Sequence, residues 1–150
     1  MGSIGPALYP IGVQVMSAIL HIYDEMPGSK RTLAGTVTLS SERATVRDII
    51  RRRVEEEVKE YNRWKEGVFQ GLVQPAESER IVNGDMVHYE LAEGRAIDAA
   101  EQIRIALESF EAKRYHMLFD DRQVAQLEDE VTLTGNNAAT FIKMTALVGG

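Results

Sequence analysis

The pattern of apolar and polar residues predicts an opening β-hairpin across residues 19–39. Residues 19–23 are rich in strand-forming side chains, and Pro27-Gly28 supplies a turn. After the turn, positions alternate with a period of two, as expected for a strand that buries one face. On this pattern the buried set is Leu33, Gly35, Val37 and Leu39.

An amphipathic helix is predicted to follow the hairpin. Thr45 and Asp48 have the spacing of a capping box, in which each side chain accepts a hydrogen bond from the other residue's backbone N–H. Apolar residues then recur at helical spacing: Val46, Ile49, Ile50, Val54, Val58 and Tyr61. On the outer face we expect ion pairs of Arg51 with Glu55, Glu55 with Lys59, and Arg53 with Glu57. Three glutamates follow Arg51–Arg53 one turn later, so a solvated helix face explains this run better than a phosphate-binding patch.

Weaker patterns predict the remaining elements. Residues 67–94 favour a small hairpin or an ordered loop, with Asn83-Gly84 as a tight turn. A second amphipathic helix is indicated by Ile97, Ala100, Ile103, Leu107 and Phe110. A short strand at 115–119, a turn-rich stretch and a final strand complete the chain. This order is typical of an α+β fold with a mixed sheet. One such fold that fits is the β-grasp, in which the first and last strands run parallel in the centre of the sheet.

The composition limits the classes of function. A chain of 150 residues with 44% apolar residues is sufficient for one domain. Its formal net charge of -6 argues against nucleic-acid binding through phosphate neutralisation. No stretch approaches the roughly 20 apolar residues that a membrane span needs. Because cysteine is absent, there is no disulfide, thiolate nucleophile or Cys-based metal site. We expect a cytoplasmic protein without membrane or nucleic-acid partners.

Residues for catalysis or metal binding do not stand out in the sequence. His21, His88 and His116 lack metal-ligand spacing, and the acidic residues between 120 and 130 lack the pattern of a calcium loop. There is no glycine-rich phosphate loop, and no Ser, His and Asp arrangement with the spacing of a nucleophile elbow. We therefore expect that the chain is not an enzyme and uses neither metal nor cofactor.

The two ends of the chain differ from the central domain. Residues 1–17 are predicted to form a loose arm, because an otherwise apolar stretch is interrupted by glycine and proline. Residues 18–144 are expected to form one domain, and residues 145–150 an extended tail that closes on Gly149-Gly150. Taken alone, such an ending is also compatible with an ordinary fraying terminus.

The stretch YHMLFDDRQVAQLEDEVTLTGNNAATFIKMTALVGG, residues 115–150, resembles the C-terminal half of ubiquitin. The likeness lies in the short strand ending at Phe119, the turn with Arg122-Gln123, the LED sequence at 127–129 and the final glycines. Residues 18–61 also resemble ubiquitin's N-terminal hairpin and helix, whereas about residues 62–112 form an insertion without counterpart there. The chain is thus similar to a divergent ubiquitin-like modifier with a β-grasp fold, like those of bacterial ubiquitin-like conjugation operons.

This resemblance implies a function at the C-terminus. An activating enzyme would adenylate the carboxylate of Gly150, and a conjugating enzyme would pass it to target proteins through an isopeptide, ester or thioester bond. A processing protease is a further expected partner. Gly149 would let the backbone enter a narrow channel. Ala146, Leu147 and Val148 would contact the activating enzyme, and the modifier itself would supply no catalytic side chain.

The resemblance also suggests a partner-binding patch, at the positions Leu118 and Met144. An alignment from the C-terminus places Lys143 where ubiquitin has a core leucine. Because burial of an unpaired ammonium is costly, we expect a register shift of one residue, with Ile142 and Met144 inward and Lys143 outward.

Two other functions fit the same features. A sulfur carrier shares the fold, the glycine pair and the adenylation step, but forms a C-terminal thiocarboxylate; such carriers are usually much shorter. A β-grasp adaptor would bind partners through its sheet without being conjugated, and deletion of Gly149-Gly150 would not affect it.

Overall fold

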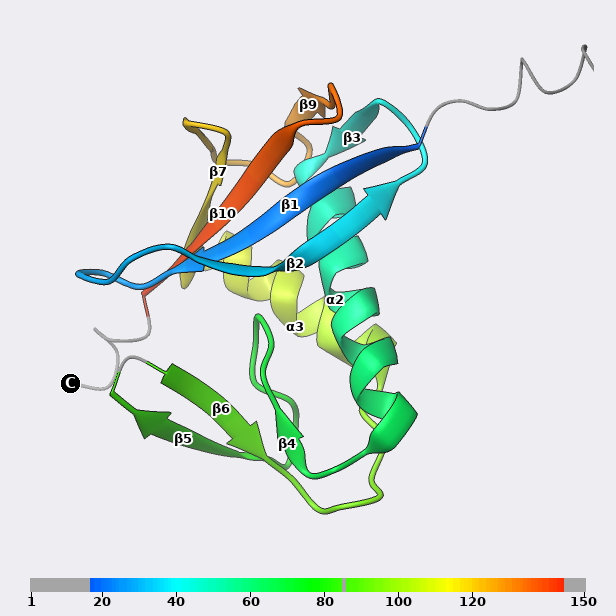
Figure 1. Cartoon of the computed structure of the whole chain (residues 1–150), viewed down its shortest axis with the longest axis vertical. Helices are drawn as coiled ribbons and strands as arrows, with labels where there is room; N and C mark the ends of the chain where they lie inside the picture. The colour runs from blue at the N-terminus through cyan, green and yellow to red at the C-terminus, as the bar shows by residue number, and fades with distance from the viewer. Residues whose placement is uncertain (1–16, 85, 145–150) are drawn as a thin grey trace, which may run out of the picture.

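The computed structural model describes residues 17–84 and 86–144, which form an α+β fold with a mixed sheet and two helices (Figure 1). The elements are β1 (Ala18–Glu25), β2 (Thr32–Leu39), β3 (Arg43–Thr45), α2 (Val46–Trp64), β4 (Val68–Phe69), β5 (Glu79–Asn83), β6 (Met86–Glu90), α3 (Ala99–Glu111), β7 (Tyr115–Phe119), β8 (Arg122–Val124), β9 (Glu130–Thr132) and β10 (Asn137–Lys143). The expected hairpin, both helices and the strand at 115–119 are confirmed.

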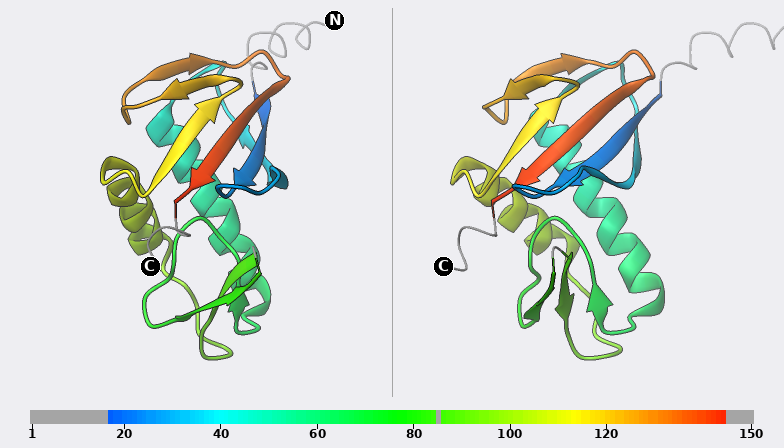
Figure 2. Two further views of the ribbon diagram at one scale, coloured as in Figure 1. Left: turned by 90° about the vertical axis from the view of Figure 1, so that its left-hand side faces the viewer. Right: turned by 60° about the vertical axis from the view of Figure 1, so that its left-hand side comes forward.

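The main sheet has the strand order β2-β1-β10-β7-β8 within the described residues. β1 pairs in parallel with β10 and antiparallel with β2, while β10 pairs antiparallel with β7. The first and last strands of the described chain are therefore parallel neighbours, as expected, and β10 lies in the middle of the sheet. Figure 2 shows β10 between β1 and β7 from two sides.

The helix α2 begins where the sequence predicts. The side chain of Thr45 accepts a hydrogen bond from the backbone N–H of Asp48 at 3.1 Å, and Asp48 accepts one from the N–H of Thr45 at 3.0 Å. The capping box is therefore confirmed. The apolar face of α2 packs against the main sheet, where Leu20 and Phe141 are fully buried. Complete burial of a large apolar side chain contributes about 1.5–3 kcal/mol.

One residue of the predicted buried set, Leu33, is instead 62% exposed. The register between β1 and β2 shifts after Ile22, so that Ile22 lies opposite Gly35, whereas Tyr23 lies opposite Leu33. The extra residue in β2 is Ala34. A bulge of one residue moves every side chain beyond it to the other face of the strand. This shift leaves only Val37 and Leu39 buried from β2.

A second, smaller sheet has the strand order β4-β6-β5 in the part of the chain that the structure describes; we call it the small sheet. It lies below the main sheet in Figure 1. The predicted turn between β5 and β6 is confirmed, and Gly84 takes a left-handed φ of 67° there. β3 and β9 form a separate two-stranded pair that the sequence pattern did not predict.

Hydrogen bonds hold the small sheet and its connections against both helices. The hydroxyl of Tyr61 in α2 accepts a bond from Gly67 N at 2.9 Å, and Asn62 exchanges two bonds of 2.9 Å with the backbone of Ile97. Gln102 of α3 is 2% exposed and donates to the carbonyl of Val73 at 2.9 Å. These polar contacts, two buried and two partly buried, fix the small sheet relative to the helices, because an unmade bond at a buried position costs about 1–3 kcal/mol.

Candidate functional site

The strand β10 carries the chain toward the predicted conjugation site. It ends at Lys143, and the backbone N–H of Met144 still donates to the carbonyl of Arg114 at 3.2 Å. Met144, the residue before the predicted tail, is therefore held beside the beginning of β7. The predicted tail residues 145–150, including Gly149 and Gly150, lie outside the described residues, as do residues 1–16 of the predicted arm. Their assigned roles stay predictions.

The two residues of the predicted partner-binding patch are placed at different levels of the sheet. Leu118 lies opposite Thr140, whereas Met144 follows the end of β10. Thr140 and Met144 are four positions apart along the chain, which corresponds to about 13 Å in a strand. The pair His116 and Ile142 lies between them, so any shared patch would have to include that pair.

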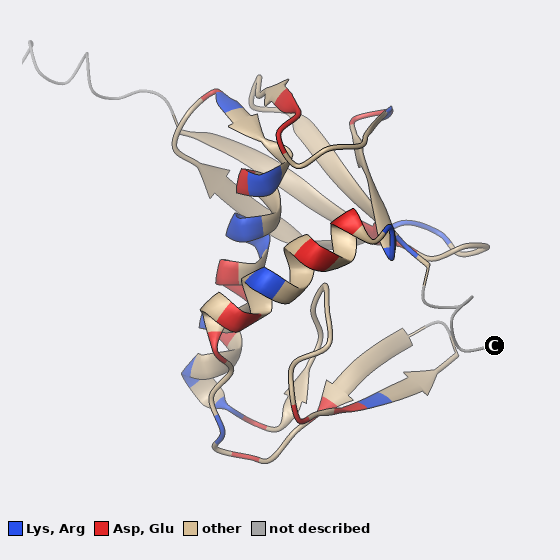
Figure 3. Cartoon of the chain, turned by 180° about the vertical axis from the view of Figure 1, so that it is seen from behind, with Lys and Arg blue, Asp and Glu red and all other residues tan. Residues whose placement is uncertain are grey.

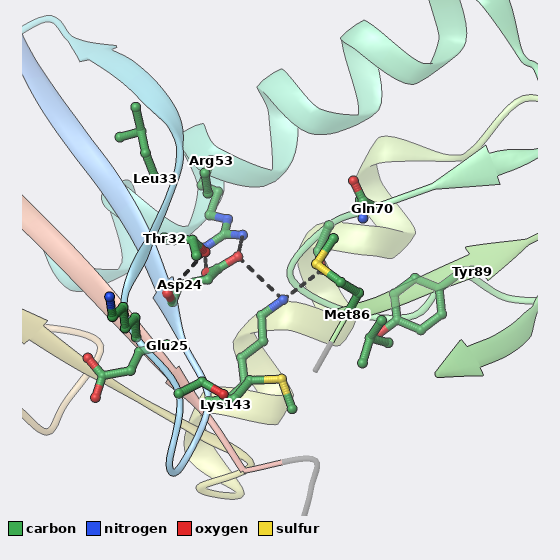
Figure 4. A pocket seen from close by; sticks show the side chains of 15 residues that line it. Asp24, Glu25, Thr32, Leu33, Arg53, Gln70, Met86, Tyr89 and Lys143 are labelled. Carbon is green, nitrogen blue, oxygen red and sulfur yellow. Dashed lines mark hydrogen bonds and ion pairs between the residues drawn. The ribbon is translucent and has the colours of Figure 1, made fainter. Parts of the chain in front are cut away.

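Four charged side chains meet near the end of β10: Asp24, Arg53, Glu57 and Lys143. We call them the charge cluster. Arg53 is 3% exposed, and its Nη1 and Nη2 donate to Asp24 Oδ1 and Oδ2 at 2.6 and 2.9 Å. Its Nε donates to Glu57 Oε2 at 2.9 Å. The other oxygen of Glu57 accepts a hydrogen bond from the backbone N–H of Leu72 at 3.1 Å, so the cluster joins β1, α2 and the segment after β4. Figure 4 shows Asp24, Arg53 and Lys143 of this cluster.

The expectation that Arg53 lies on the outer face of α2 is wrong. Its pair with Glu57 exists, but it is buried against the sheet rather than solvated. On the exposed side, Arg52 pairs with Glu55 and Glu56 at 3.0 and 2.9 Å. Both signs of charge are distributed along α2 and α3 in Figure 3. A signal was present in the sequence, because Arg53 follows Ile50 by three residues and so falls on the apolar stripe.

The expectation that Lys143 points outward is also wrong. Phe141 is fully buried, and two residues later Lys143 lies on the same face of β10, with a side chain only 18% exposed. Its Nζ donates to the carbonyl of Gly71 at 3.1 Å and lies 3.5 Å from Asp24 Oδ2. These partners offset the cost of burying the ammonium. Because the ammonium of Lys143 is paired, its burial requires no shift of register.

The cluster shifts the pKa values of its own members. Burial alone would raise the pKa of Asp24, but Arg53 and Lys143 hold it below its ordinary value of 3.8. Burial lowers the pKa of Lys143, although the carboxylate of Asp24 opposes that shift. Burial would also lower the pKa of Arg53, yet Glu57 and Asp24 raise it above its ordinary value. The cluster carries two positive and two negative side chains, so its charges balance.

The charge cluster lies beside a cleft of about 440 Å³ between the β1–β2 hairpin and the small sheet; we call it the junction cleft. Leu33 and Met86, on opposite sides of it, are 62% and 55% exposed. Tyr89 also lines the cleft and is 5% exposed. Within residues 17–84 and 86–144, its hydroxyl has no hydrogen-bond partner. Figure 4 shows these side chains around Lys143.

The junction cleft offers apolar contact at Leu33 and Met86 and a hydroxyl donor at Tyr89, and other polar side chains also line it. Burial raises the pKa of Tyr89, while Arg80 partly opposes this, so the phenol keeps its proton at neutral pH. None of the described residues form a group of three or more His, Cys, Asp or Glu that could hold a metal ion. In the same described ranges, no helix is long and apolar enough to span a membrane.

Comparison with protein-family models, with curated proteins and with solved structures found no significant match for this chain. We therefore infer its function from the geometry of the described residues and from the resemblance to ubiquitin-like modifiers.

Proposed function

We propose that this chain is a cytoplasmic ubiquitin-like modifier with a β-grasp fold, activated at the carboxylate of Gly150 and attached to target proteins. The observation that supports this most is the position of β10 between β1 and β7, with β1 parallel to it. A strand paired on both sides holds the base of the tail firmly. The bonds of Met144 to Arg114 and of Lys143 to Gly71 add to that support.

The proposed chemistry takes place in the partner enzymes. The carboxylate of Gly150 attacks the α-phosphate of ATP, which forms an acyl-adenylate and releases pyrophosphate. A nucleophile of the enzyme, and later one of the target, then attacks the acyl carbon, and AMP leaves in the first of these transfers. Gly149 and Gly150 carry no side chains, so they allow close approach of the enzyme to the acyl carbon. The chain itself positions its C-terminus and needs no catalytic group.

A cellular conjugation assay tests the proposal. The chain is expressed in its source cells with an affinity tag before Met1, purified under denaturing conditions and digested with trypsin. Lys143 is the last Lys or Arg, so trypsin leaves the seven residues Met144–Gly150 on the acceptor side chain of each target. We expect peptides with this branch from the wild-type chain and none from a variant without Gly149-Gly150.

Other outcomes assign the alternatives. An intact mass that increases by one oxygen-to-sulfur exchange, without branched peptides, would make the chain a sulfur carrier. If branched peptides and a change of mass are both absent, the chain is an unconjugated adaptor. Either result would overturn the proposed modifier function.

A further inference from the structure

We propose that the junction cleft is the surface on which the activating enzyme docks. This inference rests on the proposed function, and it assigns the partner surface to Leu33, Met86 and Tyr89 rather than to the open face of the main sheet.

The length of the tail limits where the activating enzyme can dock. In the proposed function the reacting carboxylate is that of Gly150, seven residues beyond Lys143. An extended chain spans at most about 3.6 Å per residue, so the carboxylate lies within about 25 Å of Lys143. An enzyme that encloses this carboxylate in a nucleotide pocket must place its own surface close to the end of β10. Lys143 lines the junction cleft, which is therefore among the nearest surfaces available to that enzyme.

The chemistry of the cleft walls also favours a docking site. Leu33 and Met86 are two of the large hydrophobic side chains that remain more than half exposed, and they face one cleft from two different sheets. Exposed apolar groups collected around a hollow are typical of an interaction site. The buried hydroxyl of Tyr89 lacks an acceptor within the described residues, which costs free energy unless a ligand or water supplies one.

These features define the partner segment. Glu25 and Lys30 also line the cleft and carry opposite charges, and the charge cluster beside it is already balanced. The cleft therefore favours a neutral segment rather than a strongly charged one. The enzyme would insert an apolar side chain between Leu33 and Met86, and it would offer a carbonyl oxygen to the hydroxyl of Tyr89. Met86 and Tyr89 belong to the segment without counterpart in ubiquitin, so the contact would restrict this chain to its own activating enzyme.

A pair of matched double variants tests the site in the conjugation assay. The first is Leu33→Ser with Met86→Ser, which removes the exposed apolar walls of the cleft. The control is Ile19→Ser with Val82→Ser, which changes one residue of each sheet, both about half exposed at 51% and 52% and neither in the cleft. We expect at least tenfold fewer branched peptides from the cleft variant, and a yield within twofold of wild type from the control. Thermal unfolding midpoints of both should stay close to wild type.

A photocrosslink identifies the enzyme. A chain that carries a benzophenone amino acid in place of Met86, and is otherwise wild type, should capture the activating enzyme. The captured protein should adenylate the purified wild-type chain, which is measured as ATP-dependent release of pyrophosphate. The same group at position 82 should not capture that protein. The tyrosine variant Tyr89→Phe should give several-fold fewer branched peptides.

The outcomes separate the two proposals. If the wild-type chain yields no branched peptides, the modifier function fails and the docking site fails with it. If the wild-type chain is conjugated and the cleft variant is conjugated equally well, only the docking site is overturned. If the yield of branched peptides falls equally in the cleft variant and in its control, the docking site is overturned as well.

Discussion

Arg53 and Asp24 form a bidentate ion pair that joins α2 to the first strand of the main sheet, with N···O distances of 2.6 and 2.9 Å. Their side chains are 3% and 23% exposed. Removal of one partner from a buried pair leaves the other charge in a medium that solvates it poorly. The pair therefore makes the position of α2 on the sheet sensitive to a single carboxylate.

We expect Asp24→Ala to lower the free energy of unfolding by about 3 kcal/mol, because Arg53 would retain only Glu57 as a charged partner among the described residues. Glu128→Ala is the matched control, since it removes an exposed pair with Arg47 and should cost less than about 1 kcal/mol. Urea denaturation measures both. Equal losses in the two variants would show that the Arg53–Asp24 pair contributes no more than a surface pair.

Acidic pH should weaken the same interaction. Asp24 has a lower pKa in the folded protein than its ordinary value of 3.8. Between the folded-state and unfolded-state pKa values, its carboxylate therefore binds fewer protons in the folded state than in the unfolded state. Its contribution is present above the unfolded value and is lost as the pH falls through the folded pKa. The stability difference between wild type and Asp24→Asn should therefore be full at neutral pH and shrink below about pH 4. Urea titrations at several pH values measure it, and a constant difference would contradict the assignment.

Local sequence patterns predicted the elements that depend on neighbours in the chain. The capping box of Thr45 and Asp48 and the Asn83-Gly84 turn are formed by residues within a few positions of one another. The pair of β3 and β9 was not predicted, because each has three residues and their partners are nearly ninety positions apart. No periodicity can develop in such short strands.

The candidate site was harder to predict because it depends on partners from distant segments. Lys143 is stabilised by Gly71 and Asp24, and neither is near it in sequence. Burial of an ammonium is costly, and the sequence of the strand alone does not reveal the partners that compensate for it. The exposure of Leu33 similarly depends on a bulge at Ala34, which the alternating pattern does not reveal.

Gly71 should tolerate no side chain. A Cβ at this position would lie 2.3 Å from Cζ of Phe69, and that ring is held between Tyr61 and Tyr89 with centroid distances of 5.7 and 6.4 Å. Overpacking of this kind costs about 1–3 kcal/mol. We therefore expect Gly71→Ala to lower stability by that amount in urea denaturation. The exposed neighbour Gln70 provides the control, since Gln70→Ala should change stability by less than about 0.5 kcal/mol. A neutral Gly71→Ala would mean that the segment after β4 can move away from Phe69.

Two buried tyrosines offer the sharpest comparison. Tyr115 is 3% exposed and its hydroxyl donates to the carbonyl of Ala106 at 2.7 Å, whereas Tyr89 is 5% exposed and its hydroxyl has no partner within the described chain. Tyr115→Phe removes a made hydrogen bond and should cost about 0.5–1.5 kcal/mol. Tyr89→Phe removes an unpaired buried hydroxyl, so stability should stay unchanged or rise slightly. Because both substitutions delete one oxygen from a buried ring, their difference isolates the hydrogen bond. If Tyr89→Phe destabilises the protein as much as Tyr115→Phe, the Tyr89 hydroxyl already has a partner such as bound water, and it would not be free to bind the activating enzyme.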